Sequence, residues 1–346
     1  MPVPQLPSEL PIPPHYDTSK ADQVWKVPYE ERASQARRWA EDHNISPALS
    51  DHFKIELLGV DLQNTFCIPG FELYVGGRTN RGAVEDNQRL VDFVYRNLNV
   101  ITHVSLTMDT HQAVQIFHAI FLVDSQGNYP SPYTLISAED IQQGRWKFNP
   151  AVADSLGVKP ESAQRHLEHY TTELQKNAKY DLTIWPYHAM LGGIGHALVS
   201  AVEEAVFFHT IARHSQPDFI LKGDNSITEH YSAVGPEVLS NPEGEKIGQK
   251  DKRIIQKVVE NDVVIIAGQA KSHCVAWTVE DLLAHFQESD PGQLKKIYLL
   301  EDCSSLVVVP DMVDYTDHAN AAYQRFASSG MNVVKSTDSI MSWLNK

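Results

Sequence analysis

The chain has 346 residues, of which 42% are hydrophobic and 21% charged, so it can fold around a sizeable apolar core. Its formal net charge of −15 disfavours a general role in binding nucleic acid or anionic membranes, because both partners are themselves negative. Three cysteines without a CxxC pair argue against a disulfide framework and fit a reducing compartment. We find no long apolar run and no signal-peptide pattern, so we expect a cytoplasmic protein without a membrane span.

Residues 1–50 differ in composition from the rest of the chain. Prolines are concentrated before residue 15, and the polar stretch that follows has the composition of a helix ending near Asn44. We predict an N-terminal extension that packs either on the main body or on a second subunit. A disordered tail is the alternative, because proline-rich polar segments bury little apolar surface.

Residues 51–346 are predicted to form one domain in which strands alternate with helices. The predicted strands are apolar runs at 53–62, 99–109, 218–223, 262–268, 295–302 and 331–336. Helical patterns occupy 80–99, 195–214, 250–261, 275–287 and 315–330. Strands that are apolar throughout are typical of a parallel sheet covered on both faces. The sequence therefore predicts an α/β fold, with three α/β/α layers around a doubly wound, six-stranded, mainly parallel sheet.

An insertion at about 112–193 interrupts this alternation. It contains the turn-rich segment YPSPYT, a polar helical stretch and the segment WPYH. Long insertions in compact folds usually carry function or make contacts, so we expect this one to belong to a site or an interface.

Ionisable or nucleophilic residues follow four of the predicted strands. Asp61 ends the first strand, Asp109 and His111 follow the second, Lys222 ends the third, and Cys274 follows the fourth at the start of a helix. The carboxyl ends of parallel strands meet at one edge of a sheet, where active sites of such folds lie. We therefore expect these residues to form one active site.

Cys274 is the candidate nucleophile. A thiol at a helix N-terminus near Lys222 is expected to have a lowered pKa, because both features favour the thiolate. Asp61 is the candidate general base, and backbone N–H groups of the preceding turn are candidates for an oxyanion hole. A buried, inert thiol is the commoner role of a lone cysteine, and we assign it to Cys67 and Cys303. Taken singly, Asp61 could instead cap a turn and Lys222 could lie in solvent.

Asp109, His111 and His188 are the candidate metal ligands. In an extended Asp-x-His segment both side chains point to the same side, and His188 could complete a carboxylate–imidazole–imidazole site. Such a donor set suits Zn²⁺ first, with Fe²⁺ or Mn²⁺ as alternatives. Because the chain has 16 histidines, chance pairings are expected. We assign structural or surface roles to His118, His196, His209, His230 and His285, and leave His273 open.

The chain resembles the isochorismatase-like cysteine hydrolase superfamily, and within it the nicotinamidase branch. The match spans about residues 53–335. Its segments come in the expected order: LLGVDLQNTF with Asp61, Gln63, Asn64 and Phe66, MDTH with Asp109 and His111, IWPYH with His188, ILKG and HYSAV with Lys222, and IIAGQAKSHCV with Cys274. Together these motifs are specific, whereas none is specific alone.

The resemblance implies a triad of Cys274, Asp61 and Lys222 that cleaves an amide through a thioester and releases ammonia first. It also implies a cis peptide bond between Gln269 and Ala270, with the amides of Ala270 and Cys274 forming the oxyanion hole.

The same resemblance implies a substrate pocket that includes Phe66 and Gln63. It implies a divalent metal, bound by Asp109, His111 and His188, that holds the pyridine nitrogen of a nicotinamide-like substrate. Members of this fold commonly self-associate, so we expect a dimer or a tetramer.

The chain departs from the family pattern in the walls of the pocket. Thr110 replaces a frequent aromatic residue, Ala189 replaces a frequent cysteine after the third ligand, and Lys271-Ser272 replaces Thr-Asp before the nucleophile. These changes leave the reaction class better defined than the substrate.

Three functions are therefore considered. The first is a metal-containing amidase that acts on nicotinamide or a related small amide. The second is a hydrolase of the same fold that acts on a ureido or carbamoyl compound, with the metal absent or unimportant. The third is a non-catalytic binding scaffold, which the presence of Asp61, Lys222 and Cys274 disfavours. Isochorismatase activity is less favoured, because it is vinyl-ether hydrolysis and needs no metal.

Overall fold

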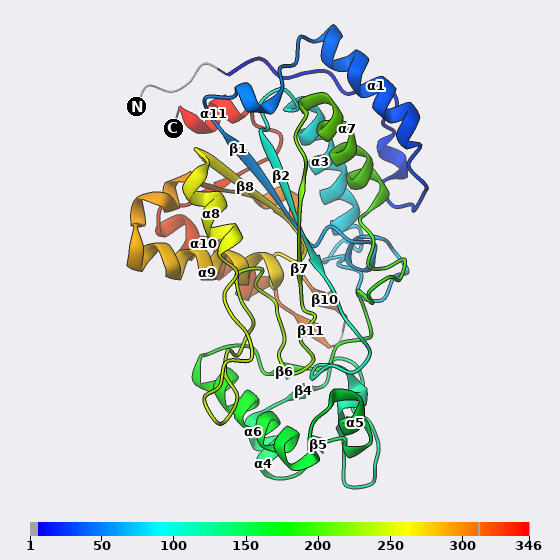
Figure 1. The fold of residues 1–346 in the computed structure, drawn as a ribbon, viewed down its shortest axis with the longest axis vertical. Coiled ribbons are helices and arrows are strands. Elements are labelled where there is room, and N and C mark those ends of the chain that lie inside the picture. Colours follow the sequence, from blue (N-terminus) through cyan, green and yellow to red (C-terminus); the bar gives the residue numbers. More distant parts are fainter. Residues whose placement is uncertain (1–5, 311, 346) are drawn as a thin grey trace.

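A six-stranded sheet forms the centre of the molecule. The computed structural model describes residues 6–310 and 312–345. Every neighbouring pair in this sheet is parallel, in the order β12-β9-β8-β1-β2-β7, which confirms the predicted parallel sheet (Figure 1). Its strands are β1 (Ile55–Val60), β2 (His103–Asp109), β7 (Asp218–Lys222), β8 (Val263–Gly268), β9 (Ile297–Leu300) and β12 (Asn332–Val334).

Helices cover both faces of this sheet, as the apolar strand sequences predicted. All residues of β1 and β8 are buried, so neither strand has a face that could meet water. Helices α3 (Gly82–Arg96) and α7 (Ser200–Arg213) pack on one face. Helices α8 (Lys252–Glu260), α9 (Cys274–Ser289) and α10 (Thr316–Ser328) pack on the other, which completes the three α/β/α layers.

The chain order creates a switch point between β1 and β8. From β1 the chain adds β2 and then β7 on one side, and later adds β8, β9 and β12 on the other. The loops that leave β1 and β8 therefore diverge to opposite faces, and the crevice beyond their carboxyl ends is where ligands bind in such sheets.

The described residues 6–50 pack on the main body, which is one of the two predicted arrangements; residues 1–5 lie outside the described part. Leu10 and Trp25 join the cluster beneath α3 and α7, and Trp25 exchanges hydrogen bonds of 2.9 and 3.0 Å with the Ser200 hydroxyl. The predicted helix is shorter than expected, because α1 (Tyr29–Asp42) begins only after Pro28. A proline disfavours helical conformation in the residue before it.

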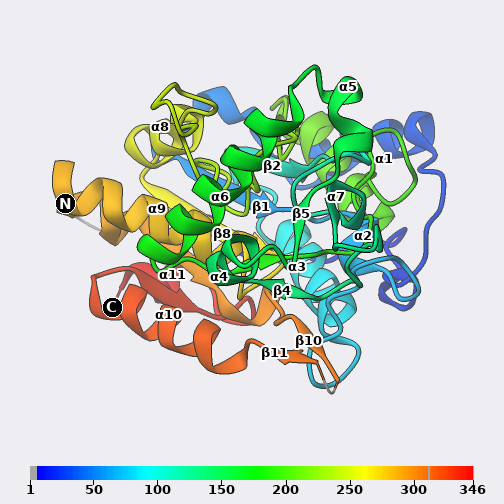
Figure 2. The same cartoon turned by 90° about the horizontal axis from the view of Figure 1, so that it is seen from below.

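The insertion forms a small layer of its own beyond the carboxyl ends of the strands (Figures 1 and 2). Its core contains Phe121, Leu167 and Tyr170, and Val238 from the segment after β7 joins it. Its elements are β3 (Leu122–Val123), β4 (Leu135–Ile136), α4 (Ala138–Gln142), β5 (Lys147–Phe148), α5 (Ala153–Leu156), α6 (Pro160–Lys176) and β6 (Leu182–Thr183). Further short elements are α2 (Asn64–Cys67), β10 (Val308–Val309), β11 (Val313–Asp314) and α11 (Ile340–Leu344).

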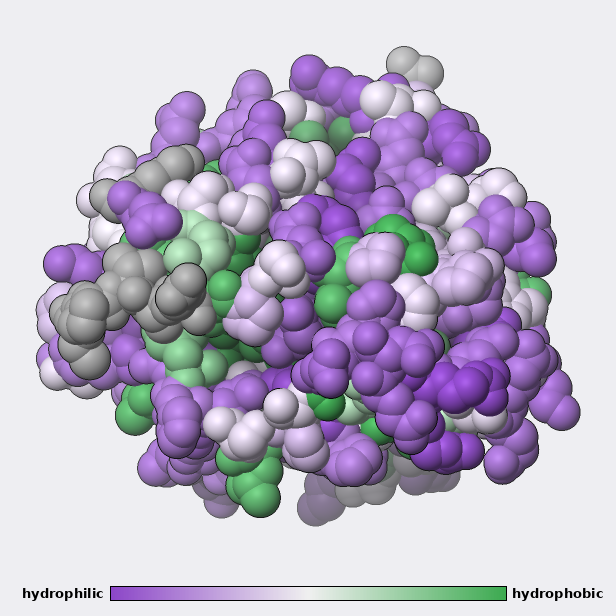
Figure 3. Space-filling model, turned by 90° about the horizontal axis from the view of Figure 1, so that it is seen from above, coloured by the Kyte–Doolittle hydropathy of each residue, from purple (hydrophilic) through white to green (hydrophobic). Residues whose placement is uncertain are grey.

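The opposite end of the molecule is mostly hydrophilic, with apolar residues in small separate groups (Figure 3). No helix among the described residues has the length and apolar character needed to cross a membrane.

An ion pair joins the N-terminal extension to the body and can be tested. Arg32 Nε lies 2.6 Å from Glu204 Oε1, and both side chains are largely buried. Replacing Arg32 by Met should lower the free energy of unfolding by about 2 kcal/mol, because the Glu204 carboxylate would be left buried without its partner. The measurement is urea denaturation, and Arg32→Met/Glu204→Leu should recover most of the loss. An unchanged urea midpoint in Arg32→Met would show that this pair does not hold the extension.

Candidate active site

Four of the expected residues meet at the carboxyl edge of the sheet, around the ammonium group of Lys222. Lys222 Nζ lies 2.9 Å from Asp61 Oδ2, 2.8 Å from Asp109 Oδ1 and 3.5 Å from Cys274 Sγ. It also donates to the carbonyl oxygen of His230 at 3.0 Å. The exposed fraction is 0% for Asp61, 1% for Lys222, 4% for Asp109 and 7% for Cys274. The structure thus brings these side chains together out of water.

Asp61 is held by the neighbouring strand. Its backbone N–H donates to Thr107 on β2, and the Thr107 hydroxyl donates to Asp61 Oδ1. The second carboxylate oxygen, Oδ2, is the one that faces Lys222. Burial raises the pKa of Asp61, and Lys222 opposes that rise. A buried carboxylate with a raised pKa is a better proton acceptor than one in water.

The pKa of Cys274 corrects the expectation from sequence. Helix α9 does begin at Cys274, and Lys222 does lower the pKa of the thiol. Burial has the larger effect, however, and with Asp61 and Asp109 nearby it raises the pKa of Cys274 well above its ordinary value. The hydrogen bond between the thiol and Asp61 also favours the protonated form of Cys274. A thiolate forms only when a base takes that proton.

The turn before Cys274 matches the expected geometry. The Gln269–Ala270 peptide bond is cis, as predicted. Gly268 has φ +120° and lies so close to β1 that a Cβ there would be 2.0 Å from the Val60 oxygen, so only glycine fits. Among the described residues, neither the Ala270 nor the Cys274 amide N–H donates to another protein group. Both remain available to an oxygen in the cavity.

Side chains from distant segments hold this turn. Gln269 donates its amide to Asp86 at 2.8 Å and accepts the Ser305 N–H at 3.1 Å. The Tyr180 hydroxyl, from the insertion, donates to the Ser272 carbonyl at 3.0 Å. The insertion therefore contacts the segment that carries the nucleophile.

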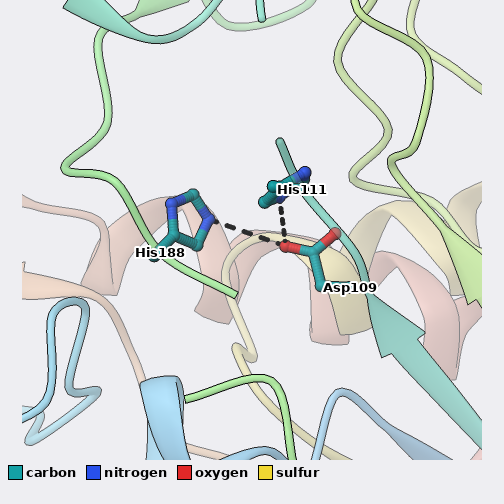
Figure 4. A group of neighbouring side chains, drawn as sticks. All are labelled: Asp109, His111 and His188. Carbon is teal, nitrogen blue, oxygen red and sulfur yellow. Dashed lines mark hydrogen bonds and ion pairs between the residues drawn. The ribbon is translucent and has the colours of Figure 1, made fainter. Parts of the chain in front are cut away.

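Asp109, His111 and His188 converge beside this cluster (Figure 4). Asp109 Oδ2 lies 2.7 Å from His111 Nε2 and 3.6 Å from His188 Nε2, and one possible ligand atom from each residue lies within 4.8 Å of the others. The Nδ1 atoms contact the carbonyl oxygens of Gly223 and Pro186 at 3.0 and 2.7 Å. A carbonyl oxygen can only accept a hydrogen bond, so each Nδ1 carries the ring proton. Each Nε2 can then present its lone pair to a metal. The residues present therefore fit a divalent ion.

His118, to which the sequence analysis assigns a structural or surface role, also lies at this cluster. Its ring centroid is 6.0 Å from those of both His111 and His188. Its Nδ1 contacts the carbonyls of Gln112 and Ala113, and its Nε2 is buried without a partner among the described residues. Only its short distance in sequence from His111 could have indicated this position.

A narrow cavity opens onto Cys274. Phe66, as expected, and His273, which had been left open, both line it. The insertion and the segment after β7 supply Trp185 and Tyr231. Both stand in segments quoted for the family resemblance, IWPYH and HYSAV, but neither was named there as a site residue.

Gln63 does not line this cavity, and its expected contact with substrate is not supported. Its amide group donates to the carbonyls of Asp109 and His196 at 2.8 and 2.9 Å and accepts the Asp109 N–H at 2.7 Å. Both polar atoms of its side chain are thus hydrogen-bonded to backbone groups. Gln63 instead fixes the backbone of Asp109.

Two further polar residues on the cavity wall, Glu229 and His230, were not singled out from sequence as site residues. Burial raises the pKa of Glu229 to about 7. Its Oε1 accepts the His230 N–H at 2.9 Å, while Oε2 is buried without a hydrogen-bond partner among the described residues.

Comparisons with known proteins show a similarity of fold. No protein-family model and no curated protein sequence matches the chain. Structural neighbours include nicotinamidases and pyrazinamidases. The nicotinamidase/pyrazinamidase of Acinetobacter baumanii is 18% identical with a TM-score of 0.48, covering 82% of this chain and 97% of its own. The yeast nicotinamidase is 17% identical with a TM-score of 0.49, covering 81% of this chain and 99% of its own. The zinc complex of Pyrococcus horikoshii pyrazinamidase is 16% identical with a TM-score of 0.40, covering 82% of this chain and 99% of its own.

At these identities the similarity shows an arrangement of strands and helices, and TM-scores below 0.5 carry no functional argument. Any function proposed for this chain must therefore rest on the residues of its own site.

The raised pKa of Cys274 predicts slow alkylation at neutral pH. A raised pKa favours the neutral thiol, so the thiolate fraction at pH 7 is smaller than for free cysteine and increases as the pH rises. The iodoacetamide reaction rate at Cys274, followed by peptide mass spectrometry from pH 6 to 10, should therefore climb through the whole range. Cys67 and Cys303, buried away from the cavity, serve as internal controls. Fast alkylation that is independent of pH between 6 and 8 would contradict this description of the thiol.

Proposed function

We propose that this protein is a cysteine hydrolase that cleaves the C–N bond of a small amide and releases ammonia and an acid. The observation that carries the proposal is the contact of the Cys274 thiol, which lies on the wall of the cavity, with Lys222 and Asp61. A nucleophile, a base and a fixed positive charge within reach of one another are the parts that acyl transfer requires.

The first half of the reaction forms a thioester. Asp61 takes the thiol proton as Cys274 Sγ attacks the amide carbonyl carbon. The ammonium group of Lys222 stabilises the negative charge that moves between sulfur and carboxylate. The oxyanion of the tetrahedral intermediate accepts hydrogen bonds from the N–H groups of Ala270 and Cys274. Protonated Asp61 then gives its proton to the leaving nitrogen, the C–N bond breaks, and ammonia departs.

The second half returns the enzyme to its starting state. Asp61, again a carboxylate, takes a proton from a water molecule whose oxygen attacks the thioester carbon. The same two N–H groups stabilise the second tetrahedral intermediate. When this intermediate collapses, the C–S bond breaks, the sulfur regains its proton and the acid product leaves.

Asp109, His111 and His188 are proposed to hold a divalent metal, with zinc favoured and iron or manganese as alternatives. When bound, the ion would supply a Lewis acid that binds an acceptor atom of the substrate or a water molecule. The residues themselves have a second task, since Asp109 uses its other oxygen to hold Lys222.

The aromatic walls of this narrow cavity favour a small planar amide, so nicotinamide is the first substrate to test. Several structural neighbours carry that activity in their names. A ureido or carbamoyl substrate is the alternative, and the two proposals differ in their need for metal. Self-association and a cytoplasmic location stay predictions. The exposure of Phe219 and Leu221 on the edge strand β7 would suit an interface between copies.

Cys274→Ala should abolish ammonia release from nicotinamide, because the thioester cannot form. Asp61→Asn and Lys222→Met should each lower kcat/KM by at least about 10³-fold, since the residues of such a unit act together. The measurement is a coupled ammonia assay on nicotinamide and on an N-carbamoyl compound. Cys303→Ala, which removes a buried thiol outside the cavity, is the matched control. Ammonia release by Cys274→Ala at the wild-type rate would end the proposal.

His188→Ala should weaken zinc binding by at least about 100-fold, because it removes a ligand from the proposed set of three. Titration calorimetry of metal-stripped protein measures this directly. His188 is a cleaner choice than Asp109, whose loss would also free Lys222. His196→Ala is the control, because this histidine contacts the Thr110 hydroxyl and lies outside the cluster. Equal zinc affinity in wild type and His188→Ala would place the metal elsewhere.

A further inference from the structure

One nitrogen on the cavity wall has no task in the proposed reaction. His230 lines the cavity, and its Nε2 is buried without a hydrogen-bond partner among the described residues. We propose that the Nε2–H group of His230 selects the substrate by donating a hydrogen bond to an acceptor atom, an oxygen or a ring nitrogen, on its acyl group. This inference deepens the proposed function and rests on it.

The contacts of His230 define which ring nitrogen carries the proton. The backbone N–H of Gly223 donates to His230 Nδ1 at 3.3 Å, so Nδ1 must offer its lone pair. A neutral imidazole has one proton, which then sits on Nε2. Burial, with a smaller contribution from Lys222, lowers the pKa of His230 to about 3, so the ring stays neutral. A residue on the cavity wall therefore carries a neutral N–H group that has no partner among the described residues.

The backbone of His230 is fixed by the catalytic cluster itself. Its carbonyl accepts from Lys222 Nζ at 3.0 Å, and its N–H donates to Glu229 Oε1 at 2.9 Å. Both backbone groups and one ring nitrogen are thus bonded within the protein. Only Nε2 is left for a ligand, and its place is set by the residue that holds Cys274 and Asp61. A donor placed in this way is rigid relative to the scissile bond.

A donor of this kind discriminates between otherwise similar amides. A buried N–H left without a partner is costly, so a substrate that offers no acceptor binds with that cost unrelieved. Glu229 Oε2 and His273 Nε2 also lack hydrogen-bond partners among the described residues and belong to the same wall. An unsubstituted phenyl group would satisfy none of the three. The acyl group that suits this cavity is therefore flat but carries at least one acceptor.

The test compares amides that differ only in a ring acceptor. Benzamide and the three pyridinecarboxamides, with nitrogen at ring position 2, 3 or 4, have nearly the same shape. Wild-type protein loaded with zinc should prefer one pyridine isomer over benzamide by about tenfold or more in kcat/KM. In His230→Phe this ratio should fall towards one. His230→Gln should keep part of it, because its amide can accept from Gly223 and donate into the cavity.

Each other outcome has a distinct meaning. If His230→Phe still prefers a pyridine amide, the preference comes from the metal, because this variant keeps the metal ligands. That result overturns the role of His230. If His230→Phe loses kcat/KM equally on benzamide and on the pyridine amide, and the alkylation of Cys274 changes, the substitution has displaced Lys222. That result also overturns the role of His230. If wild type hydrolyses benzamide as well as every pyridine isomer, the amidase stands and the specificity role falls. If no amide releases ammonia, the proposed function itself fails.

Discussion

The charge of Lys222 inside the protein is the constraint on which the site depends. An ammonium group removed from water is tolerated only when opposite charges and acceptors surround it. Asp61 and Asp109 supply those charges, and although burial works against it, they raise the pKa of Lys222 well above its ordinary value. Because each of the three residues ends or follows a different strand, the sheet must form before the charges can meet. The local geometry of the site is therefore a product of the whole parallel sheet.

Asp109 links the two halves of the site. One of its oxygens contacts Lys222, and the other faces His111 and His188. Gln63 fixes the backbone of Asp109 from both sides, which explains why a fully buried glutamine comes so soon after β1. A change at Asp109 would disturb the nucleophile and the metal ligands together. Changes at His111 or His188 would affect the metal ligands without removing the contact between Asp109 and Lys222. These two positions can therefore separate the role of the metal from the role of the nucleophile.

Strand order made part of the site predictable from sequence. The rest depends on packing between segments that are far apart in the chain, which the sequence does not reveal. Asp61, Asp109, Lys222 and Cys274 were found because each ends or follows a strand, and parallel strands share an edge. His230 has no such marker: its role comes from a loop that folds back onto Lys222. The pKa of Cys274 was expected to fall, because a helix start and a lysine are local features that can be read from sequence. Burial raised it instead, and burial depends on segments far away, including the insertion.

The direction of that pKa decides how the proposed reaction can begin. Before any metal is bound, the carboxylates of Asp61 and Asp109 around Cys274 outnumber the single ammonium of Lys222, so a free thiolate would add a further negative charge to a buried site. Proton transfer to Asp61 avoids this, since it neutralises one carboxylate as the sulfur becomes negative. The net charge of the cluster then stays constant until the negative charge passes to the substrate oxygen. The cluster therefore favours attack by a thiol that loses its proton in the same step, rather than by a thiolate formed beforehand.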